Sequence, residues 1–273
     1  MEQRADLHIH TFHSDGTFAP EEVVRRAKAV GLSAISITDH DTVAGLPAAI
    51  AAAGGEMEVI PGVELTGAFR DRELHILGYF LKWEDPSFAN FLSEMQKYRL
   101  GRIQAMIDQL RVQEVATVTL EEVRSVAGNG AVGRPHLAQV LVNREVVSSL
   151  QEAFDRYLGD DAPCFVKGAT LTVPKAVQII QAVGGVAVLA HPYRIVEDSW
   201  IPDLVEAGIQ GIEAYHSEQP ASVAQRYEQI AKQHKLLITG GSDCHGFRRS
   251  KGPLIGSVSV PYHVVERLKA AVR

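Results

Sequence analysis

Cysteine and long apolar runs are both scarce in this sequence. Its 273 residues include only two cysteines, Cys164 and Cys244, which are too few for a disulfide framework or a cysteine-based zinc site. No run approaches ~18 apolar residues, so we expect no transmembrane helix. The first ten residues, MEQRADLHIH, place charged residues and histidines where a secretory signal needs apolar ones. These absences predict a cytoplasmic protein with no membrane partner.

An excess of positive charge is also missing. The chain has 27 lysines and arginines against 33 aspartates and glutamates, which gives a net charge of −6. This balance argues against a broad basic surface, and therefore against stable binding of duplex DNA. A small or single-stranded anionic substrate in a local pocket remains compatible with it. What the sequence has in abundance is histidine, with 11 residues, and we therefore ask where these histidines lie.

Short apolar runs rich in β-forming residues recur along the chain, and most are followed by a segment with helical periodicity. Alternating strands and helices predict an α/β fold in which helices cover a parallel sheet or barrel. Six or seven such units favour a barrel over a small open sheet. The expected strands are residues 5–9, 33–38, 57–63, 73–80, 186–190, 209–214 and 236–239, and the expected helices are residues 20–30, 43–53, 173–183, 201–207, 221–233 and 264–272.

The middle of the chain has a different pattern. From about residue 86 to residue 158, helical periodicity continues without a convincing strand. We interpret this segment as an all-helical insertion between two strands of the α/β body. The expected division is a barrel domain of residues 1–85 and 165–273, with a helical, substrate-binding cap of residues 86–164.

Two histidines alternate at the end of the first expected strand. His8 and His10 are two residues apart, so their side chains project to the same side, and Asp15 follows in a loop that contains glycine. Taken alone, the pattern is equally compatible with an edge strand followed by a turn aspartate. Together the three side chains form a candidate metal site, because imidazole and carboxylate suit Zn, Mn or Fe.

The second expected strand ends in a Thr-Asp-His-Asp run. His40 is the candidate ligand, and Asp39 or Asp41 is expected to orient its ring. The alternative is an aspartate at a helix start with a solvated histidine beside it. A buried strand that ends in three ionisable residues favours the metal-site interpretation.

Other expected strands also end in histidine or carboxylate. Glu64 follows one strand, His191 follows another, and Asp243 and His245 repeat the two-residue spacing of the first pair. His75 lies inside an apolar strand, where a lone histidine is more often part of the core than a ligand. The carboxyl ends of barrel strands meet at one rim, so these residues fit two or three metal ions. The nine candidate ligands are His8, His10, Asp15, His40, Glu64, His75, His191, Asp243 and His245.

The motifs DLHIHTFHSDG, TDHD, AHP and SDCHG, with PGVE and LHILGYF between them, resemble those of the PHP family, named for polymerase and histidinol phosphatase. The resemblance implies a distorted (β/α)7 TIM-like barrel with a trinuclear metal centre. It also implies two or three divalent ions, manganese first, with zinc or iron as alternatives. The implied ligand sets are His8, His10, Glu64 and Asp243 for one ion, Glu64, His75 and His191 for a second, and Asp15, His40 and His245 for a third.

Within that family, the helical insertion and the run GRPHLAQVLV resemble a branch of stand-alone phosphoesterases. Its members include 3′,5′-nucleotide bisphosphate phosphatases and 5′→3′ exoribonucleases that trim short RNA ends. The resemblance implies a hydrolase whose substrate is a phosphorylated small molecule or the end of a short single-stranded RNA. The closest enzymatic alternative is a histidinol phosphatase of the same family, which lacks this Arg-Pro-His helix start. Two further hypotheses are a non-catalytic metal-binding PHP domain and a metal-dependent amidohydrolase.

Arg134 and His136 are the expected substrate contacts. They stand at a helix start after the loop GNGAVG, where free backbone N–H groups favour an anion. The alternative is a flexible turn with an exposed arginine. His216 is a candidate phosphate contact, or the acid that protonates the leaving group, and Arg194 is a further candidate contact. Asp243 is expected to act in catalysis as a metal ligand.

Overall fold

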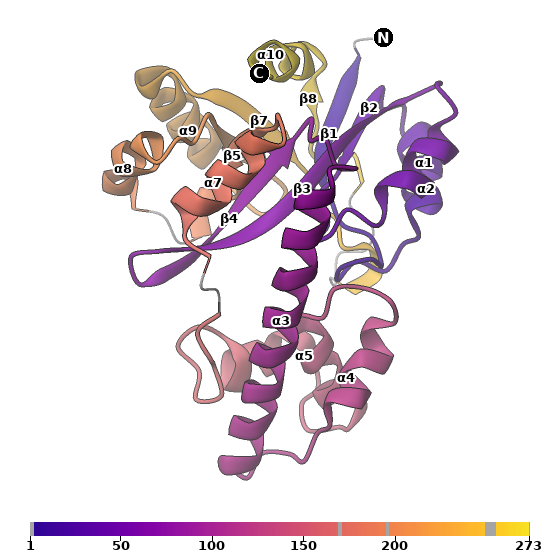
Figure 1. Ribbon diagram of the computed structural model, residues 1–273, viewed down its shortest axis with the longest axis vertical. Helices are drawn as coiled ribbons and strands as arrows, with labels where there is room; N and C mark the ends of the chain where they lie inside the picture. Colours follow the sequence, from indigo (N-terminus) through magenta and orange to yellow (C-terminus); the bar gives the residue numbers. More distant parts are fainter. Residues whose placement is uncertain (1–2, 169–170, 195–196, 249–254, 273) are drawn as a thin grey trace.

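One eight-stranded sheet forms the body of the molecule (Figure 1). The computed structural model describes residues 3–168, 171–194, 197–248 and 255–272. In spatial order the strands are β7 (Leu237–Gly241), β6 (Gly211–His216), β5 (Val186–Leu189), β4 (Arg72–Tyr79), β3 (Glu58–Phe69), β2 (Ala34–Ile37), β1 (Arg4–Ile9) and β8 (Val260–Pro261). Just beyond β7, Cys244 pairs with Ile9 of β1. The two sides of the sheet therefore meet, and the barrel is nearly closed.

The predicted α/β barrel is confirmed, but the expectation of a wholly parallel sheet is wrong. β4 runs antiparallel to both β3 and β5, and β8, which was not predicted, runs antiparallel to β1. Only Arg70 and Asp71 separate β3 from β4, and a connection this short makes a hairpin rather than a crossover. The first half of β4 therefore lies at the same rim as the carboxyl ends of its neighbours, and this reversal brings His75 to that rim.

Helices cover the outside of the barrel in two groups (Figure 1). Buried residues of β1 and β2 share one hydrophobic core with the first group, and buried residues of β3 to β6 share another with the second. One end of the barrel is closed by a last helix, whose Val265 and Leu268 pack with the interior residues Leu7 and Leu77. The first group is α1 (Pro20–Ala29) and α2 (Leu46–Ala53), the second is α7 (Val173–Ala182), α8 (Ile201–Glu206) and α9 (Ala221–His234), and the closing helix is α10 (His263–Ala271).

A helical segment between β4 and α7 lies at the end of the molecule opposite α10 (Figure 1). Its first helix, α3, has 27 residues and is about 40 Å long. The first half of α3 packs on the barrel through Phe88 and Leu92, and the second half joins a separate core through Ile103 and Leu110. The helices of the segment are α3 (Pro86–Val112), α4 (Leu120–Ala127), α5 (Arg134–Asn143), α6 (Leu150–Ala153) and the π-helical turn η1 (Phe154–Leu158). Within the described residues, no helix is both long and apolar enough to cross a membrane.

Candidate metal centre

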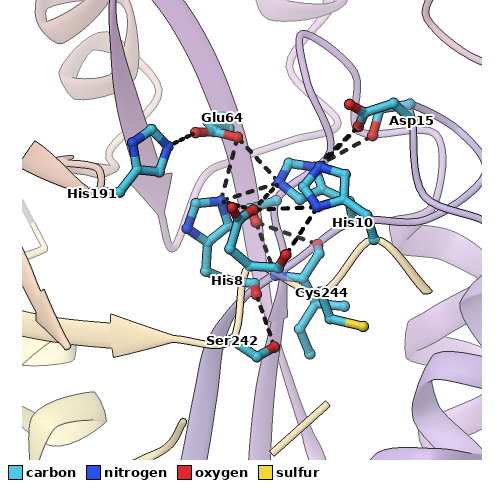
Figure 2. A network of polar contacts seen from close by, with 12 residues as sticks. His8, His10, Asp15, Glu64, His191, Ser242 and Cys244 are labelled. Atoms are coloured by element: carbon cyan, nitrogen blue, oxygen red, sulfur yellow. Dashed lines mark hydrogen bonds and ion pairs between the residues drawn. The ribbon is translucent and has the colours of Figure 1, made fainter. Parts of the chain in front are cut away.

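The first two histidines lie side by side at the end of β1, as their spacing predicts. Both are fully buried, and their Nε2 atoms are 3.1 Å apart. At this distance one neutral imidazole can donate a hydrogen bond to the other. Both Nε2 atoms also lie close to the same oxygen of Glu64. Figure 2 shows both rings turned toward Glu64.

Glu64 lies at the centre of the cluster, between the histidines of β1 and His191 (Figure 2). It is 1% exposed, and its two carboxylate oxygens face different groups of histidines. Its Oε2 lies 3.3 Å from Nε2 of His8, 3.1 Å from Nε2 of His10 and 3.2 Å from Nδ1 of His40, and its Oε1 lies 2.8 Å from Nδ1 of His75 and 3.0 Å from Nε2 of His191. A carboxylate between two groups of nitrogen atoms is suited to bridge two cations.

Two further carboxylates flank the histidines of β1. Asp243 Oδ1 lies 3.3 Å from Nε2 of His8 and 3.2 Å from Nε2 of His10. On the other side, Asp15 Oδ1 lies 3.3 Å from Nε2 of His245. The structure therefore brings all nine candidate ligands to one rim of the barrel, while their individual roles as ligands stay a prediction.

Three residues at this rim have a left-handed backbone conformation. Asp41, His191 and Asp243 have φ angles of 50°, 25° and 50°, a region that residues other than glycine seldom occupy. Each lies a few residues beyond the end of a strand. Such conformations cost free energy and are concentrated at functional sites, and here they turn the chain sharply where it leaves the sheet.

The electrostatic environment keeps the carboxylates ionised. Burial raises the pKa of Glu64, but its electrostatic interactions and hydrogen bonding with the surrounding histidines outweigh burial and hold that pKa well below its usual range. Burial lowers the pKa of His10, but hydrogen bonds to Asp243 and Glu64 raise it to about 10. The carboxylates thus create a strong negative potential at the imidazole nitrogens, which favours a cation there.

The donor set fits divalent metal ions. The ligand atoms fall into groups within 4.8 Å of one another, namely His10, Asp15, His40 and His245; His8, His10 and Asp243; and His40, Glu64 and His75. Asp15 Oδ1 and His40 Nδ1 are buried and have no hydrogen-bond partner among the described residues. Buried polar atoms without partners are costly, and coordination to a cation would satisfy such atoms in the cluster. Imidazole with carboxylate suits Mn, Fe or Zn, so the donor set does not select one of these metals.

The aspartates next to His40 do not orient its ring, so that prediction is wrong. Asp39 accepts hydrogen bonds from the backbone N–H of Thr11 at 2.7 Å and from the hydroxyls of Thr11 and Ser14 at 2.6 Å. It therefore ties down the loop that carries Asp15. Asp41 instead accepts a hydrogen bond from Nε of Arg99.

Glu213 is a residue of the site to which the sequence patterns assigned no role. It lies on β6, is fully buried, and accepts from Nδ1 of His8 at 2.9 Å and from the backbone N–H of His191 at 2.8 Å. A proton on Nδ1 leaves the Nε2 lone pair of His8 facing the cluster. A carboxylate inside a buried strand was the available signal, because such a charge requires partners.

The histidine–carboxylate cluster opens into a cavity of about 1660 Å³ that reaches the helical segment. Its wall includes ligands such as Glu64 and His75 and, from the helical segment, three arginines: Arg99, Arg102 and Arg134. Burial lowers the pKa of Arg102, and the neighbouring charges of Arg134 and Arg99 act in the same direction. The histidine–carboxylate cluster and the three arginines thus line the same cavity.

The predicted substrate contacts differ in their placement. Arg134 lines the cavity, where its Nη1 donates to Asp160 at 2.6 Å. His136 is 1% exposed, and its Nδ1 accepts from the N–H of Gly133 at 3.0 Å. His136 therefore caps the start of α5 by accepting from Gly133, the residue before the helix, and does not line the cavity.

His216 is buried beside Asp243 and does not line the cavity. Its Nδ1 accepts the backbone N–H of Glu218 at 3.1 Å, and its Nε2 lies 3.2 Å from Asp243 Oδ2. A ring that accepts at Nδ1 donates from Nε2 when neutral, so these contacts favour a positioning role toward Asp243. The side chain of Arg194 lies outside the described part of the structure.

Comparisons with known proteins agree with this geometry. A family model described as the PHP domain matches residues 6–158. The chain is 33% identical to the 5′-3′ exoribonuclease Rnm of Escherichia coli, over 88% of this chain and 84% of that protein. It is 31% identical to the 3′,5′-nucleoside bisphosphate phosphatase of Chromobacterium violaceum, over 88% and 86%. A solved structure from Bifidobacterium adolescentis, assigned to the metal-dependent phosphoesterases, superposes with a TM-score of 0.89 at 27% identity, over 99% of this chain and 97% of that one.

Proposed function

The chain belongs to the PHP domain family, and we propose that its substrates are phosphate esters of nucleotides. It is a metal-dependent hydrolase of the phosphoesterase class. The substrates proposed are 3′,5′-nucleotide bisphosphates or the 5′ ends of short oligoribonucleotides. The observation that carries this proposal is the cavity that joins a histidine–carboxylate cluster to three arginines.

The cluster would hold two or three divalent ions, with manganese as the first choice and zinc or iron as alternatives. Bound ions of this kind lower the pKa of water and neutralise phosphate oxygens. The nine proposed ligands are His8, His10, Asp15, His40, Glu64, His75, His191, Asp243 and His245. Glu64 would contribute to more than one ion, because its two oxygens face separate groups of histidines.

Residues around the ligands hold them in a binding geometry. Glu213 accepts the Nδ1 proton of His8 and so keeps the Nε2 lone pair available. His216 donates to Asp243 and orients that carboxylate. With their own orientation already set, the ligands need little rearrangement when substrate arrives.

The arginines supply the complementary surface for the substrate. Guanidinium groups bind phosphate in a bidentate manner, and Arg134 is the proposed contact for a second phosphate, away from the cluster. The helical segment, residues 86–164, would then act as the substrate-binding cap that was expected for it. The cavity exceeds the roughly 300–1,000 Å³ typical of small-molecule pockets, so it has room for a nucleotide with a second phosphate or for a short RNA end.

Three competing functions predict different behaviour. A histidinol-phosphate-type phosphatase would act on a monophosphate and would gain little from Arg134. A non-catalytic metal-binding domain would load metal without turnover. An amidohydrolase would act on neutral substrates, which three cavity arginines do not favour.

The test is a substrate panel with purified protein and added Mn²⁺. We expect release of inorganic phosphate from adenosine 3′,5′-bisphosphate, or of mononucleotides from short 5′-phosphorylated RNA, and loss of either activity with a chelator. Arg134→Ala should lower activity only on substrates with a second phosphate, whereas unchanged activity of this variant, with monophosphates as the preferred substrates, would favour the histidinol-phosphate alternative. Absence of release from every phosphoester with Mn, Zn, Fe or Mg would refute the proposed function.

A further inference from the structure

Arg99 is a residue of the long helix α3, on the side of that helix that faces the histidine–carboxylate cluster across the cavity. It lines the cavity, and its side chain is only 19% exposed. Its Nε donates to Oδ2 of Asp41, and its Nη2 lies 3.5 Å from Oγ1 of Thr66. Asp41 is 1% exposed, so the guanidinium group is anchored to a buried carboxylate of the barrel.

Both partners of Arg99 are neighbours of proposed metal ligands. Asp41 directly follows His40 in the chain, and Thr66 lies two residues beyond Glu64 on β3. Residues two apart on a strand face the same side and lie about 6.6 Å apart. Arg99 therefore lies beside the cluster, on the wall of the cavity that His40 and Glu64 also line.

The guanidinium group keeps unused hydrogen-bond donors. It carries five N–H bonds, and the two contacts above engage only Nε and Nη2. Within the described part of the chain, Nη1 makes no hydrogen bond. Gly133 lies beside this atom, and a larger residue there would crowd it, because a Cβ atom on Gly133 would lie 3.3 Å from Nη1.

The buried ion pair between Asp41 and Arg99 contributes more to the orientation of the Arg99 side chain than to the stability of the fold. A buried ion pair costs desolvation of both charges and adds little net stability. It does fix a long, flexible side chain in one orientation, which an arginine needs for bidentate binding of phosphate. The backbone of Asp41 is itself in the left-handed region, a strained conformation of the kind kept at functional sites.

We propose that Arg99 binds the phosphate group that is hydrolysed, and that Asp41 is the positioning residue that holds Arg99 in place. The proposal rests on the phosphoesterase function and deepens it. Arg99 serves every substrate, because it lies beside the cluster, whereas Arg134 serves substrates with a second phosphate. Arg99 and Arg134 both bind phosphate groups of the substrate, and neither is a proposed metal ligand.

The test uses Arg99→Lys, Arg99→Gln and Asp41→Asn in the full-length, Mn²⁺-loaded protein. Arg111→Gln is the matched control, because Arg111 is on the same helix and forms an exposed ion pair with Asp108. The measurements are kcat and KM on adenosine 3′,5′-bisphosphate and on p-nitrophenyl phosphate, equilibrium binding of inorganic phosphate by calorimetry, and metal content.

Loss of the charge-assisted contact in Arg99→Gln should reduce kcat/KM about 10- to 100-fold on both substrates. It should weaken phosphate binding by a similar factor, with unchanged metal content. Arg99→Lys keeps the charge opposite Asp41 and so guards against misfolding, yet it should remain impaired because it loses the planar fork. Arg111→Gln should match the parent protein.

Asp41 is tested through a double variant. If it acts by positioning Arg99, Asp41→Asn should weaken phosphate binding in the parent and add nothing to Arg99→Gln. Loss of metal on Asp41→Asn in the Arg99→Gln background would instead make Asp41 a support for the ligand His40 and overturn its assigned role. Parent-like phosphate binding by both Arg99 variants would overturn the proposal for Arg99. Because binding of inorganic phosphate needs no turnover, this result is distinguishable from a failure of the proposed hydrolysis.

Discussion

Glu213→Gln changes one atom in the wall of the metal cluster and should weaken metal binding. In the structure both carboxylate oxygens of Glu213 accept, one from Nδ1 of His8 and one from the backbone N–H of His191. A glutamine has only one accepting oxygen, and its amide nitrogen is a donor. The substitution therefore preserves size and burial but cannot satisfy both neighbours.

Each orientation of the new amide has a cost. If its oxygen accepts from His191, the NH2 group faces Nδ1 of His8, and the ring proton must move to Nε2, the atom proposed to bind metal. If its oxygen accepts from His8, the NH2 group opposes the N–H of His191. Loss of a carboxylate behind a metal-binding histidine typically weakens metal affinity or activity about 10- to 100-fold, or about 1.4–2.7 kcal/mol.

The assay is a competition for Mn²⁺ against a chromophoric chelator, with metal content measured after dialysis. Glu228→Gln is a matched control, because Glu228 on α9 accepts from the hydroxyl of Tyr215, a residue of the same strand as Glu213, at 2.8 Å and contacts none of the proposed ligands. Metal affinity of Glu213→Gln within twofold of the parent, together with full activity, would refute the assignment of Glu213 as the residue that orients His8.

Two further changes test the barrel closure and the cavity. Gly241→Ala should destabilise the protein by about 1–3 kcal/mol in urea unfolding, because its Cβ would lie 2.5 Å from Cβ of His8 and push β7 away from β1; unchanged stability would show that the two strands can separate freely. Asp160→Asn removes the charge paired with Arg134, so KM for adenosine 3′,5′-bisphosphate should fall a few-fold while that for p-nitrophenyl phosphate stays constant. A rise in the KM for the bisphosphate would instead mean that Asp160 orients Arg134 for binding.

The rim of the barrel could be predicted because it depends on local patterns. Alternation on a strand places His8 and His10 together, and the rule that barrel strands end at one rim gathers Glu64 and Asp243 with them. His75 differs from these positions, because it lies inside an apolar strand, where a lone histidine is more often part of the core than a ligand. The reversal of β4 explains its place at the rim, but the sequence did not predict this reversal: β3 runs on to Phe69, beyond the expected end at residue 63, so the two-residue link to β4 became visible only in the structure.

The contacts behind the ligands could not be predicted, because they join residues far apart in sequence. Glu213 meets His8 across 205 positions, and Arg99 meets Asp41 across 58. Adjacency in sequence made Asp39 and Asp41 natural partners for His40, but Asp39 binds Thr11 and Asp41 binds Arg99 instead. Pairings of this kind depend on the packing of whole elements, which periodicity does not specify.

The proposed bridging of metal ions by Glu64 can be observed directly in an anomalous-difference map of crystals grown with Mn²⁺. We predict two or three peaks inside the cluster, with one oxygen of Glu64 in contact with one peak and the other oxygen in contact with another. An active, manganese-dependent protein whose crystals show no peak beside Glu64 would contradict the proposed metal centre.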